Sequence, residues 1–400
     1  MSRPGHREVG HREAGHREAG HREAGRDALV VVNPAAGGSP LVLADEVAEL
    51  LASGGYEPRI LTTSHRGEAI VEVAAAVCAG AAPIEDPAAA RGGGKDSDVG
   101  RHGDEGGIAV HGLGLVLAVG GDGTAREVAE GVARGLGNWP GGPGLADRRV
   151  QPPAVSPALL VVPGGTGNSL YRALFADASV KEVLGMVMDP GHPGVRLRHL
   201  DLGYLVELDR GVVLGASAGF LAAVLDVAGA TTDLQGRQRY EQAAIRLIGH
   251  PEELGAEVRV LVDGEPMAEG RLLLAAMGGA RHRGGSFELL PRSVLDDGML
   301  DVCAIAMPPG DRAGAVERLG QLFVEVLGGR HLEEPEVAYS RGESVVIEAL
   351  RARGDEDTGR VHFEYDGELV EGGIEPGGSL TCTVIPGAVP IWAGDPPLAG

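Results

Sequence analysis

The chain has 400 residues, of which 43% are hydrophobic, 66 are glycines and only 3% are aromatic, so it is long enough for two domains with cores of Val, Leu and Ala. Its formal net charge is −22, and such an acidic surface argues against a nucleic-acid partner because it repels phosphate backbones. The same charge disfavours permanent electrostatic docking on anionic lipid.

The cysteines and the apolar runs bear on the compartment. Cys78, Cys303 and Cys382 lie far apart and form neither a disulfide framework nor a metal-binding spacing. No apolar run is long enough to span a bilayer, and the N-terminus has no apolar signal core. We therefore expect a cytoplasmic protein in a reducing compartment.

A short repeat opens the chain, because residues 6–25 read HREVG followed by three copies of HREAG. A five-residue period fits neither a helix face nor a strand, so we predict a disordered tail over residues 1–27. The repeated histidines could bind a metal, but a low-complexity expansion or a misplaced start codon explains them better.

From Ala28 onward, apolar runs that end in glycine alternate with helical periodicity. This alternation predicts a doubly wound parallel sheet covered on both faces, in an α/β domain over residues 28–195. Residues 81–112 carry Pro, Gly and charge with little pattern, which indicates a surface insertion. The expected strands are 28–32, 58–63, 114–121 and 158–163, and the expected helices are 41–55, 67–80 and 125–135.

After about Arg196, short alternating runs bounded by Gly, Asp or Pro predominate. They predict a β-rich antiparallel sandwich or barrel over residues 196–386, interrupted by helices at 237–249 and 313–329. The last residues, 387–400, look like a loose tail.

The segment VLAVGGDGTAREVAEG, residues 116–131, ends an apolar strand in bare backbone and an acid. Ligands bind beyond the carboxyl ends of parallel strands, and glycines let backbone N–H groups approach an anion closely. Thr124 and Glu127 match a capping box that starts a helix, whose N-terminus attracts anions. A nucleotide phosphate explains the glycines, and Asp122 beside a phosphate suggests Mg²⁺ between them. A plain tight turn with a solvated Asp122 is the alternative.

Two further strand ends carry similar loops, residues 164–167 followed by Asn168, and Asn33 followed by Gly37 and Gly38. Three such loops at one sheet edge favour a nucleotide site over incidental turns. No G-x-x-x-x-G-K-[ST] motif is present, and no G-x-G-x-x-G follows a strand in a β-α-β unit. P-loop and Rossmann dehydrogenase interpretations are therefore weakened.

The ordered motifs VVNPAAGG, TTSHRGEA, GGDGTAREVAEG, VVPGGTGNS, DDGMLDV and FEYDGE resemble the diacylglycerol kinase catalytic-domain family of bacterial lipid kinases, sphingosine kinases and ceramide kinases. The resemblance covers about residues 28–386. It implies an ATP-binding α/β domain, then a β-rich lipid-substrate domain with an apolar pocket, and an active site in the cleft. It also implies ATP and Mg²⁺, and transfer of the γ-phosphate to a lipid alcohol during transient contact with a membrane surface. A homodimer is left open.

The resemblance implies roles for individual residues. Asp366 matches the general base, with Glu368 as its acidic neighbour, and Asp122 is the acidic position of the GGDGT loop. Asp297 matches a Mg²⁺-binding aspartate, with the backbone carbonyls of two neighbours as co-ligands, Val294 and Met299. ATP contacts fall on Asn33, Thr63, Gly120, Gly121, Asp122, Gly123, Thr124, Gly165 and Thr166. These groups suit phosphoryl transfer, which needs positioning, neutralised charge and a proton acceptor.

Asp-Gly is also the commonest hairpin signal, and Asp263-Gly264-Glu265 is a second copy in an equally good hairpin context. Local sequence does not separate the copies, and only the resemblance selects Asp366. The Asp-Asp-Gly at 296–298 has the same alternative as a turn.

Departures from the family pattern affect the substrate more than the fold. Ser169 stands where the family commonly has Asp, and residues 277–279 read Met-Gly-Gly. Residues 216–229 are similar to a sphingosine kinase stretch, in which Asp226 either meets a polar head group or simply ends a buried helix. Diacylglycerol and a sphingoid or ceramide-like lipid both stay open. An NAD kinase-like phosphotransferase is disfavoured because no Asn-Thr-Asp is present, and a catalytically weak nucleotide-binding relative is the third hypothesis.

Overall fold

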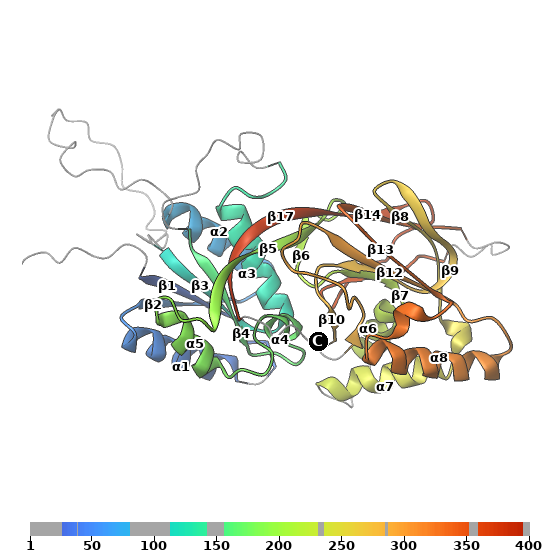
Figure 1. Ribbon diagram of the computed structural model, residues 1–400, viewed down its shortest axis with the longest axis horizontal. Coiled ribbons are helices and arrows are strands. Elements are labelled where there is room, and N and C mark those ends of the chain that lie inside the picture. Colours follow the sequence, from blue (N-terminus) through green and yellow to red (C-terminus); the bar gives the residue numbers. More distant parts are fainter. Residues whose placement is uncertain are drawn as a thin grey trace, which may run out of the picture.

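A computed structural model describes residues 26–37, 39–80, 113–141, 156–230, 236–284, 287–351 and 359–394. The HREAG repeats, the insertion at 81–112 and Gly38 lie outside this part of the chain. Figure 1 shows two halves joined by two long strands that run side by side.

The first half contains a parallel four-stranded sheet in the order β4-β3-β1-β2. Helices α1 and α5 lie on one face, and α2 and α3 lie on the other (Figure 1). This is the predicted doubly wound arrangement, and its strands are β1 (Asp27–Val32), β2 (Glu57–Thr62), β3 (Leu113–Gly120) and β4 (Ala158–Pro163). Its helices are α1 (Pro40–Ser53), α2 (Glu68–Gly80), α3 (Asp122–Gly135), α4 (Ser169–Phe175) and α5 (Val180–Met188).

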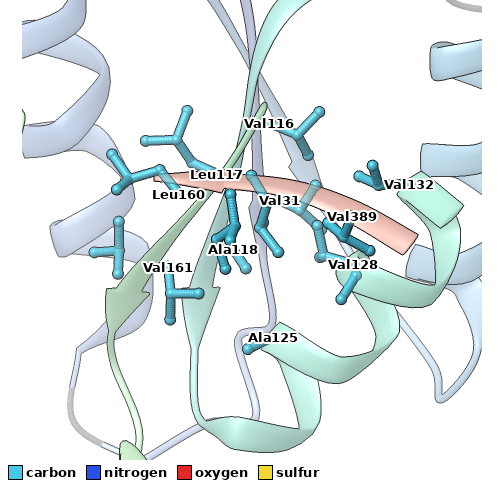
Figure 2. Packing of buried hydrophobic residues seen from close by; sticks show 14 of the residues in the cluster. Val31, Val116, Leu117, Ala118, Ala125, Val128, Val132, Leu160, Val161 and Val389 are labelled. Atoms are coloured by element: carbon cyan, nitrogen blue, oxygen red, sulfur yellow. The ribbon is translucent and has the colours of Figure 1, made fainter. Parts of the chain in front are cut away.

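The sheet is covered on both faces, which explains its sequence. Every residue of β1 is buried, and β3 and β4 are nearly as enclosed. Parallel strands covered by helices on both sides read as continuous Val, Leu and Ala runs, as these do. Figure 2 shows Val128 and Val132 of α3 packed with the sheet residues and with Val389 from the end of the chain.

Two glycines bring α2 and α3 unusually close. A Cβ built on Gly131 would lie 2.8 Å from Val73 Cβ, and one built on Gly135 would lie 2.6 Å from Val77 Cβ. Because residues four apart share a helix face, the two glycines form one flat stripe against α2. The Gly131 of the sequence EVAEG is therefore a packing requirement of this helix pair.

The second half is an antiparallel structure, as predicted. Its main path runs β16-β15-β7-β9-β8-β14-β17, and β12 pairs with both β9 and β13. The strands are β5 (Val195–Leu205), β6 (Arg210–Val212), β7 (Ala216–Gly219), β8 (Ala256–Val262), β9 (Glu265–Gly278), β10 (His282–Arg283), β11 (Phe287–Glu288), β12 (Leu300–Ala306), β13 (Val337–Gly342), β14 (Ser344–Ala349), β15 (Phe363–Tyr365), β16 (Glu368–Leu369) and β17 (Ser379–Gly394).

Three helices pack on one side of these strands and enclose a separate apolar cluster. They are α6 (Phe220–Ala230), α7 (Arg237–Ile248) and α8 (Arg312–Leu327), with short 3-10 turns η2 (Pro251–Glu253) and η3 (His331–Glu333). The helices predicted at 237–249 and 313–329 are confirmed within two residues. Among the described residues, every helix is too short or too polar to cross a membrane.

The prediction of a loose tail over residues 387–400 is wrong for residues 387–394, because these residues belong to strand β17. The strand pairs with β14, continues antiparallel to β5, and meets Leu159 of β4 at Ile391 (Figure 1). Val389, Ile391 and Ala393 are each at most 1% exposed. The Pro- and Gly-rich composition pointed to a tail, whereas the apolar residues between them complete the core of the first half.

A bulge interrupts the β5–β17 pairing between Ile385 and Val389, with Gly387 at a φ of 60°. Asp201 of β5 fixes it, accepting N–H hydrogen bonds from Gly387 at 2.7 Å and from Gly298 at 2.6 Å. Bulges bend the strand that carries them. The bend lies where the two strands pass from one half to the other.

We predict that Val389→Asp destabilises the protein strongly, because it buries an unpaired carboxylate in the core of the first half. The loss should exceed about 3 kcal/mol in the free energy of unfolding measured with urea. Val206→Asp, at a residue 46% exposed, is the matched control and should change stability little. Equal stability of the two variants would contradict the placement of β17.

Candidate functional site

Three glycine-rich loops meet beyond the carboxyl ends of β1, β3 and β4. The Gly164 N–H donates to the Gly120 carbonyl at 2.7 Å, and a Cβ on Gly165 would lie against Gly121 Cα and 2.9 Å from its backbone N. A Cβ on Gly37 would lie 3.3 Å from Thr166 Oγ1. The loops therefore touch backbone to backbone, which only glycines permit.

Asp122 joins two of these loops. Its Oδ2 accepts the Ser169 N–H and its Oδ1 accepts the Leu170 N–H, both at 3.0 Å. The carboxylate thus satisfies backbone donors at the start of α4 and fixes the position of that helix. The structure gives Asp122 this supporting contact, which the sequence did not indicate.

The predicted capping box is wrong. Helix α3 begins at Asp122 with Gly121 as its N-cap, so Thr124 already lies inside the helix, and no side chain caps it. Glu127 instead accepts the Gly67 N–H at 2.9 Å. The helix starts three residues earlier than expected because Gly120 and Gly121 let the chain turn directly from strand to helix.

The other predicted nucleotide contacts lie around the same loops. Asn33 follows β1, and its Oδ1 accepts the Ala35 N–H at 2.9 Å. Thr63 is buried and donates its hydroxyl to the Val32 carbonyl at 3.3 Å. Thr124 is also buried, whereas Thr166 is exposed. The structure therefore brings the predicted residues together, with Thr166 the most accessible of these side chains.

A turn from the second half faces these loops. It connects β15 to β16 and carries Asp366 and Glu368. Glu368 Oε2 lies 3.3 Å from Arg66 Nη1 and 3.4 Å from Arg126 Nη2. Its other oxygen, Oε1, would lie 3.6 Å from a Cβ on Gly123. Glu368 therefore reaches from the second half to the first turn of α3.

Arg126 is the buried centre of this contact. Its side chain is 2% exposed, lies 3.6 Å from Glu127 Oε1 and 3.7 Å from Glu130 Oε2, and stacks over the Tyr365 ring. Burial opposes its charge, but the carboxylates of Glu368 and Asp366 outweigh burial and raise the pKa of Arg126. A buried guanidinium with several carboxylate neighbours holds the two halves in one arrangement.

Asp366 points away from the loops into the second half. Its side chain is fully buried, Oδ2 accepts the Val213 N–H at 2.8 Å, and Oδ1 accepts the Leu214 and Gly215 N–H groups at 2.8 and 2.9 Å. Arg283 lies 3.6 Å from Oδ1. Burial raises the pKa of Asp366 to about 6, although Arg283 and the backbone donors oppose the shift.

A second buried ion pair supports the same turn. Glu364 accepts the Ser217 hydroxyl at 2.6 Å and the Gly367 N–H at 3.1 Å, and it lies 3.3 Å from Arg283. Nothing in the sequence pattern indicated Arg283, and Glu364 lies within the FEYDGE motif without an expected role. Arg66 lies within the TTSHRGEA motif and Arg126 lies one turn after Asp122, but neither pattern predicts a contact with Glu368.

Asp297 lies on the turn before β12. Its carboxylate pairs with Arg341, and its Oδ1 also accepts the Met299 N–H at 3.1 Å. Mg²⁺ requires about six oxygen ligands in near-octahedral geometry. No three metal-ligating side chains cluster within the described ranges, and a guanidinium already neutralises Asp297. The Mg²⁺ site expected at Asp297 with Val294 and Met299 therefore stays a prediction.

The second half encloses an apolar cavity of about 50 Å³, between α6, α8 and the strands β9 and β12. All of its lining side chains are aliphatic or aromatic, among them Phe220, Leu221 and Phe323. Phe220 follows β7 directly, β7 pairs with β15, and β15 leads into the turn of Asp366. The cavity and the turn that faces the glycine loops therefore share one structural unit.

Two family models match this chain. The model described as "Diacylglycerol kinase catalytic domain" matches residues 105–195, and the one described as "YegS C-terminal NAD kinase beta sandwich-like domain" matches residues 215–393. Together they cover strands of both halves and the GGDGT and DGE segments.

Individual relatives agree with these matches. A diacylglycerol kinase of Staphylococcus haemolyticus is 24% identical over 256 residues, which is 64% of this chain and 66%, slightly under two thirds, of that protein. A protein of Pseudomonas aeruginosa named "Probable lipid kinase YegS-like" is 29% identical over 71% of this chain and 79% of its own length. The crystal structure of a diacylglycerol kinase from Bacillus anthracis superposes with a TM-score of 0.55 at 15% identity, covering 94% of this chain and 98% of that chain, which shows a shared fold.

We predict that Gly165→Ala disrupts the loop contact, because the added methyl group would overlap the Gly121 backbone. The melting temperature should fall, with a loss of about 1–3 kcal/mol in stability. Gly185→Ala in α5 is the matched control, since nothing lies within 4 Å of its Cβ position, and it should be neutral or slightly stabilising. A Gly165→Ala protein as stable as wild type would refute the close approach.

A second prediction concerns pH. Because the pKa of Asp366 is about 6 in the folded protein and 3.8 ordinarily, the folded state binds more protons than the unfolded state between these values. The contribution of Asp366 to stability is therefore largest below pH 4 and is lost as the pH rises to 6, by about 3 kcal/mol in all. Urea unfolding of wild type and of Asp366→Asn across pH 4–7 measures this contribution. The difference in stability between the two proteins should shrink as the pH rises. Stabilities that change in parallel with pH would contradict the prediction.

Proposed function

This chain belongs to the diacylglycerol kinase catalytic-domain family, and on that premise we propose that it is an ATP-dependent lipid kinase. The reaction would transfer the γ-phosphate of ATP to the hydroxyl group of a lipid alcohol. The observation that carries the proposal is the position of the β15–β16 turn. One side of it meets the glycine loops, and the other leads through β7 to an apolar cavity.

The glycine loops are suited to the ATP phosphates. Gly121 and Gly123 flank the N-terminus of α3, where backbone N–H groups and the helix dipole favour an anion. Asp122 and the contact between Gly121 and Gly165 fix the loops, so little reorganisation is needed when the nucleotide binds. Mg²⁺ would enter as part of the nucleotide substrate and neutralise part of its charge.

The apolar cavity supports a lipid acceptor. A hydrocarbon chain gains free energy by leaving water for a wholly apolar lining, whereas the polar NAD molecule would lose hydrogen bonds there. A cavity of about 50 Å³ is smaller than a ligand pocket for a whole lipid, so α6 and α8 must separate as the chain enters. Diacylglycerol and sphingoid or ceramide-like lipids all present a hydroxyl beside such a chain, and each would be taken during transient contact with a membrane.

The test is a panel of acceptors with γ-labelled ATP. Diacylglycerol, sphingosine and ceramide are presented in mixed micelles, and NAD is added in solution. We expect a labelled lipid phosphate and no labelled NADP. Label in NADP alone would favour an NAD kinase-like phosphotransferase, and ATP binding without transfer to any acceptor would favour a regulatory relative.

A variant pair ties the activity to the cavity. Phe323→Asp places a carboxylate in the lining and should raise the KM for the lipid roughly tenfold or more, while ATP binding stays unchanged. Val324→Asp changes the next residue, which is 54% exposed, and is the matched control. Equal KM values for the two variants would remove the cavity from the substrate site.

A further inference from the structure

We propose that Arg66 binds the terminal phosphates of ATP, and that it reaches them by exchanging Glu368 for the nucleotide as its partner. This inference rests on the proposed ATP-dependent function and adds a cationic group to the glycine loops. It follows from the charge of those loops, from the way the backbone around Arg66 is held, and from the unequal burial of the two guanidinium groups that contact Glu368.

The glycine loops themselves supply no positively charged side chain. Residues 33–37, 120–124 and 164–168 contain neither Lys nor Arg, and their one ionisable side chain is the carboxylate of Asp122. Backbone N–H groups and a helix N-terminus carry only partial positive charges. A triphosphate bound at these loops would therefore gain from a full positive charge supplied by a neighbouring segment.

The loop that carries Arg66 connects β2 to α2, and its backbone is held in place. The Glu68 carboxylate accepts the Ser64 N–H at 2.5 Å, which closes the first part of the loop. Gly67, directly after Arg66, donates its N–H to Glu127 of α3 at 2.9 Å. The backbone at Arg66 is thereby fixed against α3, the helix at whose N-terminus the glycine loops meet.

The two guanidinium groups that contact Glu368 differ in burial. Arg66 is 72% exposed, with its Nη1 3.3 Å from Glu368 Oε2. Arg126 contacts the same oxygen at 3.4 Å but is only 2% exposed. An exposed ion pair contributes little to stability, whereas a buried charge that loses its partner is costly. Arg66 is therefore the group that can leave Glu368, and Arg126 is the group that stays.

The exchange needs only a short movement. Glu368 Oε2 contacts Arg66, and Oε1 of the same carboxylate lies 3.6 Å from the Cβ position of Gly123, in the first turn of α3. The guanidinium thus starts beside the helix end that we assign to the phosphates. Its planar fork of N–H donors matches the oxygens of a phosphate group. Binding of ATP would therefore replace an exposed ion pair by a stronger, charge-assisted contact.

The first test measures the affinities for ATP, ADP and AMP by isothermal titration calorimetry, without a lipid acceptor. Arg66→Ala should raise the Kd for ATP about 10–100-fold and the Kd for AMP less than about twofold, with ADP between them, because only the terminal phosphates lose a charged partner. Arg66→Lys keeps the charge without the fork and should recover part of the loss. Arg330→Ala is the matched control, since Arg330 is 65% exposed and pairs with Glu325 at 2.9 Å, and it should bind all three nucleotides like wild type.

The second test separates phosphate binding from a purely structural role. Arg66→Ala and Glu368→Gln break the same ion pair from opposite sides. If the pair only fixed the structure, both variants would bind ATP more weakly. The proposal predicts opposite directions, because the Glu368 carboxylate competes with the phosphates for Arg66. Glu368→Gln should therefore bind ATP at least as tightly as wild type, with melting temperatures showing that both variants are folded.

A Kd for ATP that Arg66→Ala leaves unchanged, or losses of equal size for AMP and ATP, overturns this inference and leaves the kinase function standing. Weaker ATP binding by a folded Glu368→Gln protein overturns the exchange of partners. If Glu368→Gln does not fold, the comparison of AMP with ATP decides. A wild-type chain that binds no ATP overturns the proposed function and this inference together.

Discussion

The contact between the backbones of Gly121 and Gly165 is the constraint on which the rest of the site depends. It requires two strand ends of one parallel sheet to lie side by side with no side chain between them. It places Asp122 where it holds the start of α4, and it places the first turn of α3 where the second half can reach it. One steric condition therefore sets the positions of two helix ends.

Charged side chains meet where the second half contacts α3. Arg126 is 2% exposed and lies beside carboxylates from both halves, which offset the cost of burying its charge. This makes the arrangement specific, because a small rotation of one half would separate Glu368 from Arg126. The cluster thereby fixes the orientation of Glu368 against α3.

The sequence predicted those features that depend on local pattern. The Val- and Leu-rich runs ending in glycine predicted the parallel sheet, and alternating short runs predicted the antiparallel half. Features that depend on distant pairing were not predictable. The return of residues 389–393 to the first half, the partners of Arg126 and the burial of Asp366 each join segments far apart in the chain. The two Asp-Gly-Glu copies show the limit clearly, since their turns share one local geometry. Asp263 and Glu265 are exposed, whereas Asp366 is buried and Glu368 lies against α3.

Strands β5 and β17 cross between the halves together, and this double connection governs how the molecule can move. A single linker lets two domains swivel freely, whereas a hydrogen-bonded pair of strands resists twisting and flexes where its ladder is interrupted. The interruption between Ile385 and Val389 is such a point, and Asp201 braces it from the neighbouring strand. A change in the angle between the halves would therefore bend the strand pair at this interruption rather than twist it.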